Sequence, residues 1–160
     1  PGVIDFKRTL AVAWCSYSTV IQSRSWLPDG IGGVCWFAVD NPAQSPRIPI
    51  FCGSTKLPKA FEKCGQREYY PNSVLWEFRR ANKLATLSWQ KTKKEFTGNV
   101  LEMEAMTFEG LPELEAEYSK ASARKRAKLL NAYTAGIHDK CAARWKELEA
   151  KYWSMFGRGF

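Results

Sequence analysis

The stretch STVIQSRSWLPDGIGGVCWFAVDNPAQSPRIPIF, Ser18–Phe51, decides the fold of this chain. Its two apolar segments have the composition of β-strands and are joined by the turn-forming sequence Pro28-Asp29-Gly30. The second of these strands is predicted over Gly33–Val39. A short third strand follows over Arg47–Phe51, and its Pro49 belongs at a sheet edge or strand end because proline has no N–H to donate.

The first strand is predicted upstream of the turn, over Leu10–Ile21. Its apolar residues fall on both alternating faces, which is typical of a strand that is covered on both sides. Three strands with two apolar faces do not make a complete sheet. We therefore expect that part of the sheet lies outside these residues.

Arg24 is the one cation near the end of this first strand, between Gln22-Ser23 and Ser25. A charged group next to a buried strand needs a carboxylate partner or a route to solvent. One interpretation is an ion pair at the strand end. The other is that Arg24, or Arg8 at the start of the strand, presents its guanidinium to a carboxylate or carbonyl of a substrate. The residues alone leave both open.

The chain changes character near residue 70, where strand-like patterns give way to helical ones. Asn72 or Ser73 can cap a helix that begins near Val74, and Gly98 is expected to interrupt or weaken the helical region. The last helix carries the clearest apolar stripe in the sequence, and a break at Gly136 is left open there. Strands followed by helices predict an α+β domain. The stripe consists of Leu129, Tyr133, Ile137, Cys141, Trp145, Leu148, Tyr152 and Met155.

The net charge of +8 raises the alternative of a basic helical protein that binds nucleic acid. The basic residues are spread over both halves, apart from a cluster over Arg124–Lys128 within a helical pattern. A solvated helix face is the preferred interpretation, so nucleic acid is not an expected partner. No apolar run is long enough to cross a membrane.

The sequence offers no complete catalytic or metal-binding set. The five cysteines show no CxxC spacing, and the single histidine, His138, lies three residues before Cys141. Two ligands do not make a zinc site, so His138 is expected at a helix surface or half-buried. One histidine on a helix also supports no Ser-His-Asp set. We therefore expect no catalytic residue in this chain, no metal and no cofactor.

Three ordered segments resemble one known family. They are RTL at Arg8–Leu10, the stretch already quoted, which continues into Cys52-Gly53, and YYPNSVLWEFRRANKL at Tyr69–Leu84. Together they resemble the C-terminal part of the C69 dipeptidases, which are cysteine N-terminal-nucleophile hydrolases. A looser helical similarity extends through Trp145–Leu148.

The resemblance implies a four-layer αββα fold and the hydrolysis of dipeptides. In that family a cysteine at the mature N-terminus is the nucleophile, and its own α-amino group acts as the base. This chain begins with Pro1, and none of its cysteines is N-terminal. We therefore expect residues 1–160 to be the C-terminal segment of one hydrolase domain, strand-rich over 1–70 and helical over 71–160, and inactive when alone.

The resemblance also sets the expected partners. These are the N-terminal portion of the same precursor, which would carry the nucleophilic cysteine, and a dipeptide substrate oriented by Arg24 or Arg8. Association with further copies stays open, as does a non-catalytic regulatory or scaffold role on the same fold. The compartment is open too: the resemblance suggests a secreted or lysosomal protein, whereas unpaired cysteines suit the cytoplasm.

Overall fold

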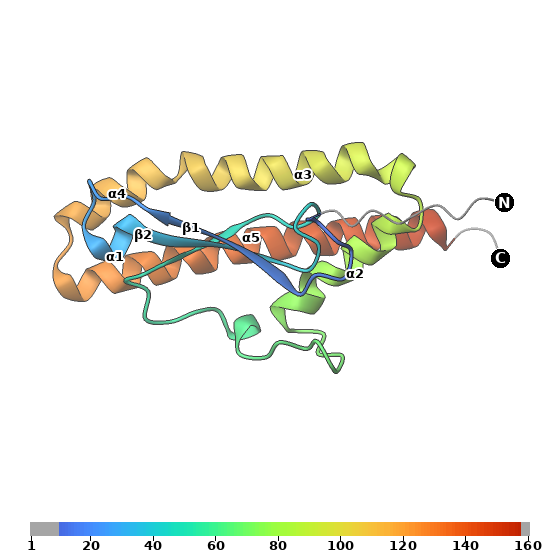
Figure 1. The fold of residues 1–160 in the computed structure, drawn as a ribbon, viewed down its shortest axis with the longest axis horizontal. Helices are drawn as coiled ribbons and strands as arrows, with labels where there is room; N and C mark the ends of the chain where they lie inside the picture. The colour runs from blue at the N-terminus through green and yellow to red at the C-terminus, as the bar shows by residue number, and fades with distance from the viewer. Residues whose placement is uncertain (1–9, 158–160) are drawn as a thin grey trace.

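The computed structural model describes residues 10–157. Its strands come first and its long helices second, which confirms the predicted α+β class (Figure 1). In chain order the elements are β1 (Tyr17–Ser23), α1 (Asp29–Gly32), β2 (Gly33–Val39), β3 (Ile48–Phe51), the 3₁₀ turn η1 (Lys59–Phe61), α2 (Val74–Thr86), α3 (Trp89–Glu109), α4 (Leu111–Lys120) and α5 (Ala123–Phe156).

The three strands form one antiparallel sheet in the order β1-β2-β3. The β1–β2 ladder pairs Tyr17 with Val39 at one end and Ser23 with Gly33 at the other. The predicted turn between them is a single helical turn, α1, in place of a plain β-turn. Pro49 lies in β3, the opposite edge strand, as its missing N–H predicts.

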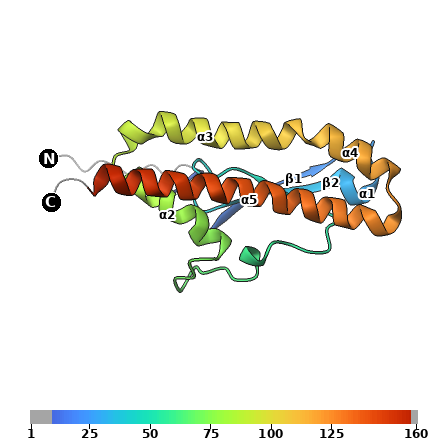
Figure 2. The same ribbon diagram turned by 180° about the vertical axis from the view of Figure 1, so that it is seen from behind.

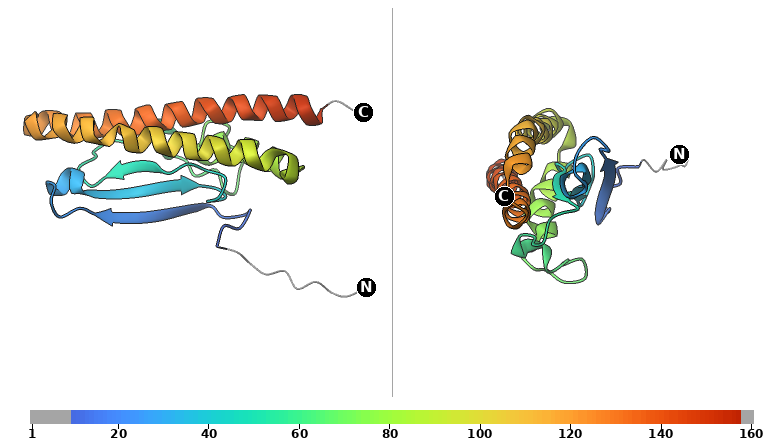
Figure 3. Two further views of the ribbon diagram at one scale, coloured as in Figure 1. Left: turned by 90° about the horizontal axis from the view of Figure 1, so that it is seen from above. Right: turned by 90° about the vertical axis from the view of Figure 1, so that its left-hand side faces the viewer.

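The β3 edge of the sheet lies toward α5 (Figure 3). In Figure 3, β3 lies nearest to the long α5, β2 follows, and β1 lies farthest away. The Thr134 hydroxyl of α5 donates a hydrogen bond of 2.8 Å to the carbonyl of Pro49, which ties β3 to the helix. Seen from behind in Figure 2, α5 crosses in front of the sheet while α3 runs beside it.

The expectation that the first strand is covered on both sides is wrong for the described residues. The strand begins at Tyr17, later than predicted, and all but one of its seven residues are exposed. Val20 is 51% exposed and Ile21 is 73% exposed. The physical reason is that β1 is the edge strand farthest from the helices, so no other layer of the described structure covers its apolar side chains (Figure 3).

Helix α2 begins at Val74, where the sequence predicts a helix start. The helical region then divides at Leu87-Ser88, between α2 and α3, and not at Gly98 as expected. The Ser73 hydroxyl accepts a hydrogen bond from the Trp76 backbone N–H and caps α2, as expected. Neither Gly98 nor Gly136 breaks its helix, and a Cβ at either glycine would meet no heavy atom within 4 Å apart from the adjoining backbone of its own helix. A glycine costs only about 1 kcal/mol against alanine inside a helix, which the packing of α3 and α5 outweighs.

Two apolar clusters hold the layers together. The larger joins α2, α3 and α5 and is centred on Trp145, whose ring packs against Phe78 and Phe96. The smaller joins α1, the sheet and α4. The predicted stripe on α5 is confirmed at its centre: Ile137, Cys141, Trp145, Leu148 and Tyr152 are buried, whereas Met155 is exposed.

Within residues 10–157, no helix is long and apolar enough to span a membrane.

Candidate functional site

Arg24 lies directly after β1 and is buried, with 7% of its side chain exposed. Its guanidinium forms an ion pair with Glu115 of α4. It also donates hydrogen bonds of 2.6 Å to the Ile31 carbonyl and 3.4 Å to the Gly32 carbonyl. The side chain therefore joins the end of β1, the short helix α1 and α4.

These contacts supply the carboxylate partner that the sequence requires for Arg24. Charge-assisted hydrogen bonds of this kind are about twice as strong as neutral ones. Because Arg24 has three polar contacts within the chain, its side chain has a structural role, whether or not it also contacts a substrate. The other predicted substrate-binding residue, Arg8, lies outside the described residues.

A second buried polar network lies at the opposite end of β2, around Asp40. Asp40 is fully buried, and its carboxylate accepts hydrogen bonds of 2.6 Å from Arg79 Nε and 3.0 Å from Asn82 Nδ2. The Asn82 amide also donates to the Ser45 hydroxyl, and its oxygen accepts from Trp145 Nε1 at 2.9 Å. This network joins β2, the loop that follows it, α2 and α5.

The backbone of Asp40 has a φ of 59°, in the left-handed region that aspartate tolerates better than most residues. Its backbone N–H donates to the Ser16 carbonyl, and Arg79 Nη2 donates to the Cys15 carbonyl. The network thus also fixes the chain that leads into β1. Sequence reasoning missed it because its hydrogen-bonded residues lie between 37 and 63 positions apart. The one local signal is Asp40-Asn41-Pro42, a turn sequence directly after a strand.

Two of the described cysteines, Cys35 and Cys141, are poorly suited to be the nucleophile of a peptidase. A nucleophilic cysteine needs a lowered pKa, because the thiolate is the reactive form. Burial raises the pKa of Cys141 to about 12, and burial together with the neighbouring Cys52 raises the pKa of Cys35. Cys52 and Cys64 are exposed. Among the described residues, no group of three or more histidine, cysteine or acidic side chains could hold a metal ion.

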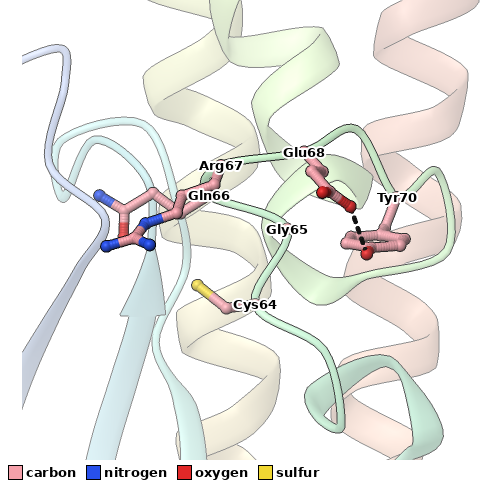
Figure 4. Close-up of a pocket in the computed structure, with 6 residues that line it drawn as sticks. All are labelled: Cys64, Gly65, Gln66, Arg67, Glu68 and Tyr70. Atoms are coloured by element: carbon pink, nitrogen blue, oxygen red, sulfur yellow. Dashed lines mark hydrogen bonds between the residues drawn. The ribbon is translucent and has the colours of Figure 1, made fainter.

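A surface cavity of about 400 Å³ lies in the loop after η1, and Figure 4 shows the residues that line it. The loop is fixed by Trp76, whose Nε1 donates a hydrogen bond of 2.7 Å to the Gly65 carbonyl. Cys64 lies on one side of the cavity, and Glu68 accepts a hydrogen bond of 2.6 Å from the Tyr70 hydroxyl on the other. The lining contains no base within hydrogen-bond distance of Cys64, so it does not define a catalytic arrangement.

His138 is buried in α5, with 4% of the residue exposed, and so is less accessible than expected. Its Nε2 lies 2.9 Å from Glu77 of α2, its Nδ1 lies 3.0 Å from Asp139, and its ring packs against Phe61. Burial alone would lower the pKa of His138, but the two carboxylates outweigh it and raise the pKa above its ordinary value. The histidine therefore bridges two helices most strongly when protonated.

We expect this bridge to make stability depend on pH. A raised folded-state pKa means that the stabilisation is complete below about pH 6.5, the unfolded value, and is lost as the pH rises through the folded pKa. The free energy of unfolding should therefore fall between pH 6 and pH 9 more steeply in the parent protein than in the His138→Gln variant. Urea titrations at a series of pH values measure both slopes, and equal slopes would contradict the bridge.

These observations define an α+β chain with an exposed edge strand, in which Cys35 and Cys141 have raised pKa values. The sequence model of peptidase family C69 matches residues 4–102, which contain the whole sheet, α2 and the first part of α3. The chain therefore belongs to peptidase family C69 and is related to peptide-cleaving hydrolases, as the resemblance predicted. No curated protein matches it.

Proposed function

We propose that this chain is the C-terminal portion of a cysteine dipeptidase, and that the nucleophilic cysteine lies outside these 160 residues. Membership of peptidase family C69 supports the reaction class. The raised pKa values of Cys35 and Cys141 support the placement of the nucleophile elsewhere. The cleaved bond would be the amide of a dipeptide, attacked by an N-terminal cysteine whose own amine takes the thiol proton.

The observation that carries this proposal is the exposed apolar edge strand β1. Long, flat, apolar edges are rare in isolated proteins because they template pairing with other chains. The strand offers seven consecutive residues for pairing, and its Tyr17, Val20 and Ile21 are exposed. An additional strand from the N-terminal portion, with a layer packed over it, would cover these side chains and extend the sheet toward the predicted αββα fold.

Arg8 and Arg24 are the proposed substrate-binding residues. Arg24 is already engaged with Glu115 and two carbonyls, so we prefer Arg8 as the residue that binds the substrate carboxylate and give Arg24 a positioning role. Steady-state kinetics distinguish the two. Arg8→Met should raise KM for dipeptides in a stably folded enzyme, whereas Arg24→Met should lower the melting temperature as well.

The activity itself is tested with the full-length protein. We expect dipeptide hydrolysis that iodoacetamide abolishes, no hydrolysis by residues 1–160 alone, and loss of hydrolysis when the processed N-terminal cysteine is replaced by serine. Hydrolysis by residues 1–160 alone would contradict the placement of the nucleophile. A stable full-length protein that binds but does not cleave dipeptides would favour the non-catalytic alternative.

The edge strand gives a second test. Replacing Ile21 with lysine should weaken association with the N-terminal portion by about tenfold or more, because a lysine on an edge strand opposes pairing and burial. The stability of residues 1–160 should change by no more than about 0.5 kcal/mol, since Ile21 is 73% exposed. Leu101→Lys, at an exposed position of α3, is the matched control. Equal binding by both variants would exclude β1 as the interface.

A further inference from the structure

Cys35 and Cys52 lie near one another on a single face of the sheet. Cys35 of β2 is opposite Ile50 of β3. The ladder ends at the pair Val34–Phe51, and the backbone N–H of Cys52 donates a 2.9 Å hydrogen bond to the Gly33 carbonyl, which continues it by one residue. Because side chains alternate along a strand, positions 35 and 52 share a face and are diagonal neighbours across the two strands.

The two thiols also share one cavity. It has a volume of about 340 Å³, and Cys35, Cys52, Ile21 and Ile50 are part of its lining. Cys52 is exposed and Cys35 is half-buried. A side chain at Gly33 would collide with the sulfur of Cys52, so this glycine leaves the space that the thiol occupies. Burial raises the pKa of Cys35, and the neighbouring Cys52 raises it further.

We propose that Cys35 and Cys52 form a redox-sensitive thiol pair, oxidised by hydrogen peroxide to an intramolecular disulfide. In the first step the Cys52 sulfur attacks peroxide: an S–O bond forms, the O–O bond breaks, and the leaving hydroxide takes up a proton as water. In the second step the Cys35 sulfur attacks Cys52: the S–S bond forms, the S–O bond breaks, and a second water leaves. The two thiols lose two electrons and two protons, and peroxide is reduced to two waters.

The positions of the two residues assign their roles. Cys52 meets the oxidant because it is exposed, and Cys35, which is half-buried and lines the same cavity, resolves the sulfenic acid next to it. Diagonal neighbours in an antiparallel pair have Cα atoms about 7–8 Å apart. A disulfide needs about 4.4–6.8 Å. Cys52 follows the last residue of β3, so a movement of about 1 Å at this strand end closes the gap.

The disulfide would link β2 covalently to the end of β3, in the part of the sheet where Ile21 of the edge strand β1 pairs with Cys35. Gly53, which follows Cys52, donates its N–H to the Gly30 carbonyl at 2.8 Å, so the disulfide would also restrain α1. Cys64 is the exposed cysteine outside this arrangement and provides a control.

Peptide mapping tests the proposal directly. Trypsin cleaves after Arg24, Arg47 and Lys56, which separates Cys35 and Cys52 into neighbouring peptides with one cysteine each. After peroxide treatment of the reduced protein and alkylation of the remaining thiols, we expect these two peptides to be joined. The Cys35→Ser variant should instead retain a sulfenic acid on Cys52 that dimedone labels, and the Cys52→Ser variant should leave Cys35 alkylated.

The Cys64→Ser variant should form the same disulfide as the parent protein. A disulfide between Cys52 and Cys64, a disulfide between two molecules, or alkylation of both thiols after peroxide treatment would each overturn the proposal. None of these outcomes depends on peptidase activity, so the thiol pair and the proposed function succeed or fail separately.

Discussion

The Trp145→Ala variant should lose about 3–5 kcal/mol of its free energy of unfolding, the range for deleting a large buried aromatic side chain. Trp145 is fully buried and packs against Phe78 of α2 and Phe96 of α3. Its Nε1 also donates to the Asn82 oxygen, which the substitution leaves without that partner. Because the total free energy of unfolding of a small domain is only about 5–15 kcal/mol, this variant should be mostly unfolded at modest denaturant concentrations.

Trp153→Ala is the matched control, because it removes the same side chain from the same helix at a position that is 60% exposed. Its stability should change by about 0.5 kcal/mol or less. Urea unfolding followed by circular dichroism at 222 nm measures both variants. Similar losses of unfolding free energy in the two variants would mean that Trp145 is not at the centre of the apolar core.

The Asp40→Asn variant should be destabilised by about 3 kcal/mol, near the lower limit for breaking a buried ion pair by removing one partner. Asparagine keeps the shape of the side chain and tolerates the positive φ at this position, so the substitution changes mainly the charge of residue 40. It leaves the Arg79 guanidinium beside an amide and places an amide nitrogen where Asn82 donates. The guanidinium retains some solvent contact, which is why the lower limit applies.

Asp29→Asn makes the same chemical change at an exposed residue and should alter stability by about 0.5 kcal/mol or less. The loss at Asp40 should also persist at high salt, because buried pairs are screened much less than exposed ones. If Asp40→Asn lowers the free energy of unfolding by less than about 1 kcal/mol, the network around Asp40 does not hold the end of β2 against α2.

The local patterns of the sequence predict most of the secondary structure. Gly33–Val39 is β2 with the predicted bounds, and the third strand and the Ser73 cap are also confirmed. These features depend on neighbouring residues, such as the missing N–H of Pro49 or the reach of the Ser73 hydroxyl. The apolar stripe around Trp145 is confirmed for the same reason, since one helix face lies within a single segment.

Features that depend on distant residues could not be predicted. The apolar residues of β1 indicated two covered faces, but whether a layer covers Val20 and Ile21 depends on elements elsewhere. The carboxylate that pairs with Arg24 is Glu115, 91 positions away, and no local pattern identifies it. Asp40 and Asn82 are separated in the same way. No local pattern indicated the proximity of Cys35 and Cys52, which follows from the β2–β3 register.

We propose that this member of peptidase family C69 works with a nucleophilic cysteine that lies outside residues 1–160. Intact-mass measurement and N-terminal sequencing of the protein purified from its native source test this placement most directly. We expect a mature polypeptide that begins with cysteine and either contains this chain or co-purifies with it. A mature protein that begins with any other residue and still hydrolyses dipeptides would contradict it.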